Sequence, residues 1–114
     1  MKKSINELVA DCYGMAQEKG WWDDGDRNIG ELMMLFTCEV AEAYEEYRNG
    51  HDVTEVYYND SKPDKPEGIP IELADVLIRI FDFCGRYGID LESAIETKIE
   101  YNATRPYRHG NKKA

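Results

Sequence analysis

The sequence predicts an all-α fold, and three observations support this prediction. Apolar residues recur at helical spacing in four segments, each bounded by a capping residue, a proline or a glycine. No strand-like alternation persists, except briefly from Val53 to Tyr58. The 114 residues suffice for one domain, and no repeat or linker divides them. We therefore predict a single four-helix domain over residues 1–114.

The first two predicted helices have clear signals at both ends. Ser4 and Glu7 form a capping box at the start of the first helix, which Gly20 ends. The second helix runs over about residues 28–49, with Gly50 as its stop.

The other two helices follow a long connection. Residues 51–68 are predicted to be a loop, and loops of this length in small domains are often functional or mobile. The third helix begins near Pro70, a favoured first-turn residue, and ends near Gly88. The fourth begins after Asp90 and ends at about Thr104.

The charge of the chain is divided unevenly. Residues 1–97 hold 9 Lys and Arg against 22 Asp and Glu, whereas residues 98–114 hold five basic residues against Glu100 alone. An acidic body repels nucleic acid, so we expect no nucleic-acid partner. A basic end can attract an anion.

Signals for export and membrane insertion are missing from the sequence. No secretory signal and no apolar run of membrane length is visible. Cys12, Cys38 and Cys84 follow no metal-ligand spacing, and we interpret them as reduced thiols. We expect a cytoplasmic protein without a membrane partner.

The third helix carries charged residues in an otherwise apolar sequence. They follow each other at steps of three and four and form one stripe about 80° wide: Glu72, Asp75, Arg79, Asp82 and Arg86. The stripe is either a solvent face or the lining of a cleft. Carboxylates in a cleft would need cations, because burying unpaired charge is costly.

The second helix carries a similar carboxylate pair, Glu39 and Glu42. Alone, it would be the solvated face of an ordinary amphipathic helix. However, Glu72 and Asp75 repeat the spacing on the next helix, and a helix hairpin could bring the pairs face to face. Four carboxylates in a partly dry cleft repel each other, and Mg²⁺, which prefers carboxylate oxygen, would relieve this. Neither pair includes a histidine, which argues against zinc and di-iron sites.

These residues resemble those of a known family. The strings over residues 38–43 and 71–78 resemble the all-α nucleoside triphosphate pyrophosphohydrolases of the MazG-like group, which carry Glu-x-x-Glu on one helix and Glu-x-x-Asp on the next long helix. The resemblance extends through residues 27–31 and 45–50 to Lys98 and residues 102–110.

The resemblance implies an Mg²⁺ site, with Mn²⁺ as a possible substitute. The implied metal ligands and catalytic residues are Glu39, Glu42, Glu72 and Asp75. It also implies that a polar fourth helix reaches the triphosphate through Lys98, Asn102 and Arg105. Without the resemblance, we would favour interpreting the two basic residues as a solvated helix end, where cations also suit the helix dipole.

The sequence does not decide which residue is the general base or which tryptophan contacts the nucleotide. Many relatives carry an acidic residue at the position of Cys38, so the group that deprotonates the attacking water is undecided between Glu45 and Glu46. Trp21 and Trp22 are candidates for stacking on a base, and we favour Trp22 for the nucleotide pocket. The alternative for a tryptophan here is a core anchor.

The predicted reaction converts a (deoxy)nucleoside triphosphate and water into a monophosphate and pyrophosphate, for cleaning the nucleotide pool. No P-loop and no Ser–His–Asp arrangement is present. Alternatives are a related pyrophosphohydrolase acting on phosphoribosyl-ATP, or a helical interaction module. The apolar third helix predicts a bundle completed by oligomerisation, as a homodimer or homotetramer.

Overall fold

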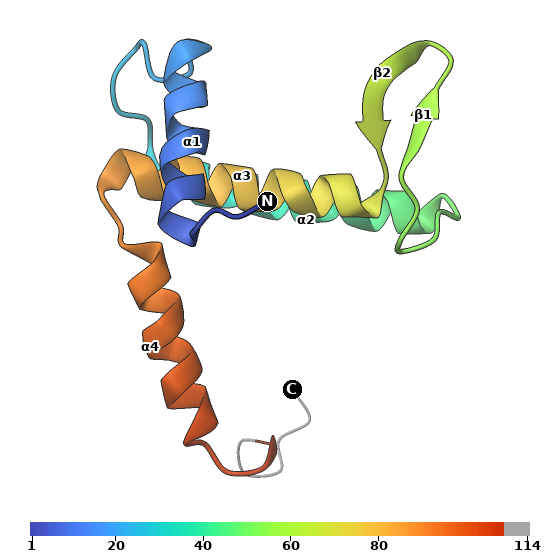
Figure 1. The fold of residues 1–114 in the computed structure, drawn as a ribbon. Helices are drawn as coiled ribbons and strands as arrows, with labels where there is room; N and C mark the ends of the chain where they lie inside the picture. Colours follow the sequence, from blue (N-terminus) through green and yellow to red (C-terminus); the bar gives the residue numbers. More distant parts are fainter. Residues whose placement is uncertain (109–114) are drawn as a thin grey trace.

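The computed structural model describes residues 1–108 and is mostly helical, with one small two-stranded sheet (Figure 1). The elements follow in the order α1 (Ile5–Glu18), α2 (Ile29–Arg48), β1 (Tyr57–Asn59), β2 (Lys62–Glu67), α3 (Ile69–Tyr87) and α4 (Leu91–Ala103). No helix in this part of the chain is both long enough and apolar enough to cross a membrane.

The helix ends agree with the predicted ones to within one or two residues. Ser4 and Glu7 form the capping box of α1, each bonding the other's backbone N–H. Asn28 caps α2 by accepting from the Glu31 N–H. Gly88 ends α3 in the left-handed conformation, with φ of 65°. Local capping chemistry therefore sets these boundaries.

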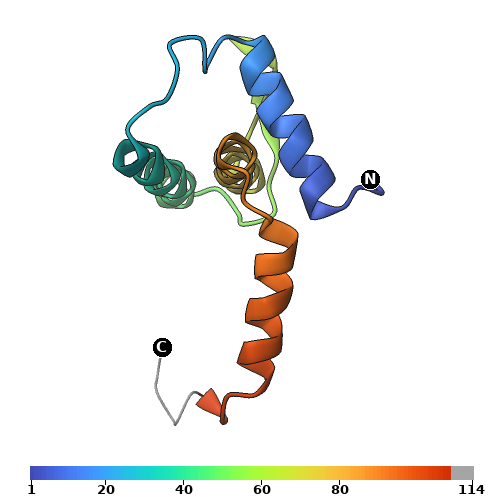
Figure 2. The same cartoon turned by 90° about the vertical axis from the view of Figure 1, so that its left-hand side faces the viewer.

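The core lies around α3, which is the central helix. Figure 2 shows α2 and α3 side by side and nearly end-on, with α1 crossing the other side of α3. Val9 of α1 packs on Phe81 and Cys84 of α3. On the other side, Leu32 of α2 and Trp22 pack against α3. Of the described side chains, none is fully buried, so the core is thin.

A β-hairpin replaces part of the loop predicted over residues 51–68. In it, Tyr57 pairs with Glu67 and Asn59 with Lys62 in antiparallel register. Gly68 joins the hairpin to α3 with φ of 125°, where a Cβ would collide with the Glu55 carbonyl. The all-α prediction is therefore correct for the core and wrong for this segment.

The fourth helix does not close a bundle within one chain. It packs mainly against the start of α1, where Asn6 Nδ2 donates to Asp90 Oδ1 at 2.9 Å, with Leu91 reaching the core cluster around Phe81, and it has no buried residue. Figure 1 shows it leaving the body at the C-terminal end of α3. The radius of gyration is 17.0 Å, against about 13 Å for a compact domain of this length.

Candidate metal centre

The antiparallel contact of α2 and α3 brings three of the four predicted ligands together. One carboxylate oxygen each from Glu39, Glu72 and Asp75 lies within 4.8 Å of the other two. Glu39 is only 8% exposed although it is charged, and the other two are half-buried. The three side chains form a carboxylate cluster between the two helices that is partly shielded from solvent.

Glu42, the fourth predicted ligand, lies beside this cluster. It is exposed, one turn along α2 from Glu39, and it lies close enough to Glu72 to help raise the pKa of that carboxyl group. Two carboxylates this close repel each other, which favours a proton on Glu72.

The crowding of carboxylates changes their acidity. Burial, the hydrogen bond and charge of Glu42, and the charges of Asp75 and Glu39 together raise the pKa of Glu72 to about 7. Burial and the charge of Glu39 also raise the pKa of Asp75, while Arg79 and Lys65 oppose this rise. The folded chain thus disfavours full ionisation of the cluster.

One oxygen of the cluster lacks a partner. Glu72 Oε2 is buried and has no hydrogen-bond partner among the described residues. Leaving a buried polar atom unsatisfied costs about 1–3 kcal/mol, and more when it is charged. Either a proton or a bound cation would remove this cost.

The donor set fits Mg²⁺ or Mn²⁺. All three groups supply hard oxygen, with no sulfur or nitrogen donor in the cluster. Opposite ligands of one Mg²⁺ lie about 4.2 Å apart, and the three oxygens lie within 4.8 Å of one another, so they are near enough to share one ion.

Arg79 is the basic residue of the cluster. Its Nε donates to Glu39 Oε1 across the α2–α3 contact. Among residues 1–108, no other Lys or Arg is within ion-pair distance of the three carboxylates. The sequence places Arg79 on the charged stripe, one turn after Asp75, but the register of the two helices, which pairs it with Glu39, is set by their packing.

Trp22 is a core residue. It is 7% exposed, its Nε1 donates to Asp82 Oδ1 at 2.9 Å, and Tyr13 and Tyr87 contact it edge-on. Arg86 lies 4.8 Å from its ring centre. The structure therefore places Trp22 in the alternative role, that of core anchor.

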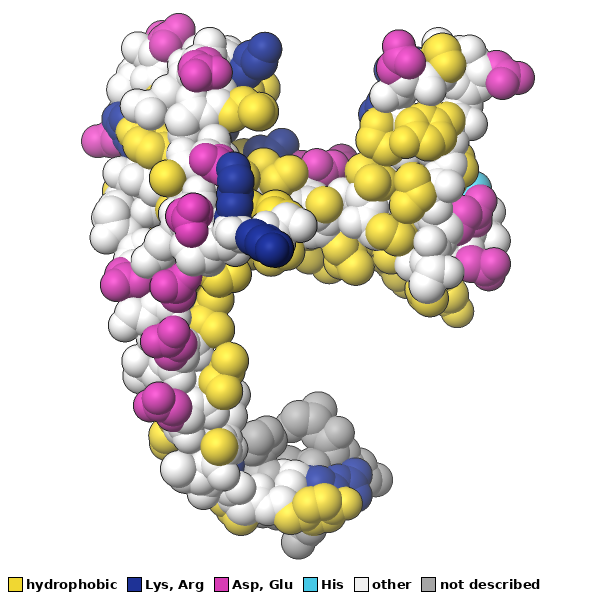
Figure 3. Space-filling model, in the orientation of Figure 1, with side chains coloured by type: hydrophobic (Ala, Val, Ile, Leu, Met, Phe, Trp, Pro, Cys, Tyr) yellow, Lys and Arg dark blue, Asp and Glu magenta, His cyan; other side chains and the backbone are white. Residues whose placement is uncertain are grey.

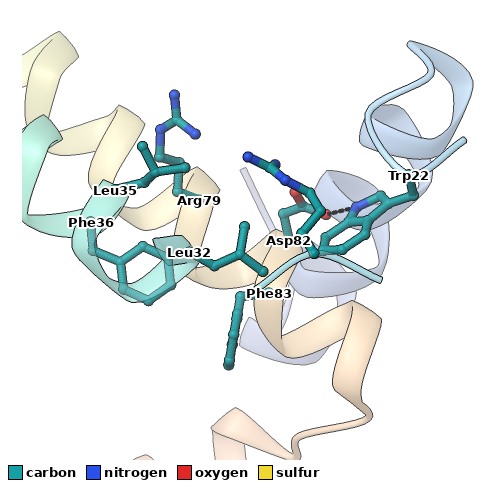
Figure 4. Close-up of a pocket in the computed structure, with 8 residues that line it drawn as sticks. Trp22, Leu32, Leu35, Phe36, Arg79, Asp82 and Phe83 are labelled. Carbon is teal, nitrogen blue, oxygen red and sulfur yellow. Dashed lines mark hydrogen bonds between the residues drawn. The ribbon is translucent and has the colours of Figure 1, made fainter. Parts of the chain in front are cut away.

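A cavity beside Trp22 is too small for a nucleobase. Figure 4 shows its lining residues, with Trp22 and Asp82 at one end and Arg79 and Leu35 at the other. Its volume is about 20 Å³, which is room for one water molecule. A base cannot stack on Trp22 without rearrangement of the core. Trp21 is 66% exposed and leaves its ring open to solvent.

The predicted triphosphate contacts lie away from the cluster in one chain. Lys98 and Asn102 are on α4 and Arg105 follows it, whereas Glu72 and Asp75 lie in the N-terminal half of α3. Figures 1 and 2 show α4 pointing away from the α2–α3 pair. One chain therefore does not bring these groups together.

The two predicted candidates for the general base, Glu45 and Glu46, are bonded to residues outside the carboxylate cluster. Glu45 pairs with Arg48 at 2.9 Å. Glu46 accepts a hydrogen bond from the Tyr57 hydroxyl at 2.6 Å, which helps raise the pKa of Tyr57 to about 12. Cys38 is an exposed free thiol.

Comparison of the chain with protein-family models, with curated proteins and with solved structures found no match. The functional argument therefore rests on the residues and their geometry.

Proposed function

We propose that this chain is a Mg²⁺-dependent (deoxy)nucleoside triphosphate pyrophosphohydrolase of MazG-like type, which serves to clean the nucleotide pool. The observation that carries the proposal is the carboxylate cluster of Glu39, Glu72 and Asp75 on the inner face of α2 and α3. An interaction module with solvated acidic stripes would expose these groups. Instead Glu39 is buried and Glu72 holds an unpartnered buried oxygen.

Each residue has a chemical role in the proposal. Glu39, Glu72 and Asp75 hold the metal, which when bound neutralises phosphate oxygens and makes bound water more acidic. Glu42 is exposed beside these three ligands, so its carboxylate can accept the proton of the attacking water. This assignment replaces Glu45 and Glu46, whose carboxylates are bonded elsewhere.

Oligomerisation is part of the proposal because one chain leaves much apolar surface exposed. On α3, Leu73, Leu77 and Ile78 are each about half exposed. Figure 3 shows hydrophobic side chains along one edge of α4 and acidic ones along the other. Patches of this kind on a small domain are typical of interfaces. We propose a homodimer or homotetramer in which α4 packs on a second copy.

The second copy also supplies what one chain lacks at the site. The last 17 residues carry a net positive charge, and the rest of the chain is strongly acidic. Packing α4 across a neighbour would bring Lys98, Asn102 and Arg105 to that neighbour's carboxylate cluster. Opposite charges favour this arrangement.

The test is pyrophosphate release from a panel of Mg²⁺ complexes that includes the common and several damaged nucleoside triphosphates and phosphoribosyl-ATP. We expect release from nucleoside triphosphates. Release from phosphoribosyl-ATP alone would assign the chain to the related activity. Release from none of them, with Mg²⁺ or Mn²⁺, would sink the proposal.

A further inference from the structure

The contact between Arg79 and Glu39 joins an exposed cation to a buried carboxylate. The side chain of Arg79 is 43% exposed, whereas that of Glu39 is 10% exposed. Arg79 Nε donates to Glu39, and its other four N–H groups bond no protein atom among residues 1–108. The guanidinium therefore closes the solvent side of Glu39 and keeps most of its donors free.

This ion pair competes with a metal ion. Glu39 Oε1 accepts from Arg79, and Glu39 is also one of the three residues whose oxygens cluster. A divalent ion and a guanidinium at the same carboxylate repel each other by Coulomb's law. Metal uptake by Glu39 therefore weakens its hold on Arg79.

A released Arg79 stays near Asp82, one turn further along α3, where one carboxylate oxygen already accepts a hydrogen bond from Trp22 Nε1. The guanidinium would stay beside the cluster, because its helix is fixed by the core. A planar guanidinium with free donors suits phosphate, which it can bind through two parallel hydrogen bonds.

Building on the proposed function, we infer that Arg79 is a phosphate-binding residue that pairs with Glu39 in the metal-free chain and with the substrate's triphosphate in the loaded one. Arg79 would thus be a phosphate-binding cation that lies on the same chain as the carboxylates. It is distinct from Lys98 and Arg105, which α4 carries away from the cluster.

Calorimetric binding without turnover tests this inference. The probes are Mg²⁺ alone, and inorganic tripolyphosphate, which has no base or sugar, at saturating Mg²⁺. The variants are Arg79→Gln and Arg79→Lys. Arg48→Gln is the matched control, because it removes the same charge from an exposed α2 residue that pairs with Glu45.

The expected results differ for the two probes. Arg79→Gln should bind Mg²⁺ about threefold to tenfold more tightly, because Glu39 loses its competing partner. It should bind tripolyphosphate at least about tenfold more weakly. Arg79→Lys should keep the fold and the charge, and bind tripolyphosphate with intermediate affinity. Arg48→Gln should match the wild type with both probes.

Three results would count against this account. Wild-type affinity of Arg79→Gln for both probes would overturn the inference alone. Weaker Mg²⁺ binding by Arg79→Gln would also overturn it, since Arg79 would then only position Glu39. No Mg²⁺ binding by the wild-type chain would overturn the proposed metal site, and the inference with it.

Discussion

Glu72 shows how one residue connects stability to function. It lies on a helix that packs in the core, among Glu39, Glu42 and Asp75, and one of its oxygens has no partner. In the absence of metal, keeping this carboxyl group in place lowers the stability of the folded chain. Such a cost is tolerated at functional sites, where a ligand removes it.

The raised pKa of Glu72 predicts how stability depends on pH. Because the pKa is about 7 in the folded chain and 4.5 in its ordinary state, the favourable contribution of the protonated group is complete below pH 4.5. It is lost as the pH rises through about 7. Allowing for solvent screening, the loss is on the order of 1 kcal/mol, or roughly 4–8 °C in melting temperature.

Thermal melting between pH 4.5 and 8.5 measures this loss as the difference in melting temperature between wild type and Glu72→Gln. Above pH 7, metal-free Glu72→Gln should melt higher than the wild type, and Mg²⁺ should stabilise only the wild type. Glu45→Gln is the control and should follow the wild type, since Glu45 lies in an exposed pair. Identical pH curves for wild type and Glu72→Gln would contradict the prediction.

At the scale of elements, close packing of α1 on α3 holds α3 in place for the site. Gly85 allows this approach, because a Cβ there would collide with the Tyr13 side chain. Gly14, on α1, has no atom within 4 Å of its would-be Cβ. These two helical glycines thus differ in whether a side chain of another helix lies near the position of an added Cβ.

Gly85→Ala should therefore destabilise the chain by about 1–3 kcal/mol through overpacking. Gly14→Ala, the matched control, should stabilise it by about 0.5–1 kcal/mol, because alanine favours a helix interior. Urea unfolding followed by circular dichroism measures both. Equal effects of the two changes would show that α1 and α3 are not packed in this way.

The helices were predictable from the sequence, whereas the hairpin was not. Capping residues such as Ser4 and Gly88 act locally, so the sequence displays them. By contrast, β2 contains Pro63 and Pro66 among charged residues, a composition that normally argues against a strand. It pairs as one of only two strands, where proline is tolerated.

The candidate site was predictable in part for a similar reason. The spacing within each carboxylate pair is fixed by the helix, so the sequence shows it. The pairing of Arg79 with Glu39 and the burial of Trp22 depend on how separate elements pack. The direction of α4 depends on packing as well, and no periodicity reveals it.

The whole molecule is open for a single chain of this length. Its extents are 50 × 39 × 32 Å, and large apolar side chains on α2, α3 and α4 face solvent. Such surface is normally covered in small domains that oligomerise. The proposed site therefore depends on the proposed assembly, because within one chain α4 carries Lys98 and Arg105 away from the carboxylates.

Mixing two inactive variants tests this shared site. One carries Glu72→Gln and the other Lys98→Ala with Arg105→Ala. If each site takes carboxylates from one copy and cations from another, re-association of equal amounts should restore about a quarter of wild-type turnover in a dimer. Each variant mixed with itself is the control. No recovery after confirmed subunit exchange would place the cations outside the neighbour's site.

The central claim is that the carboxylate cluster directs hydrolysis between the α- and β-phosphates. The most direct measurement is the product balance of the preferred nucleoside triphosphate with Mg²⁺, for wild type and Glu72→Gln. We predict one monophosphate and one pyrophosphate per substrate from the wild type, and turnover reduced at least about a hundredfold in Glu72→Gln. Release of orthophosphate and a nucleoside diphosphate would contradict the account. Unchanged turnover in Glu72→Gln would contradict it as well.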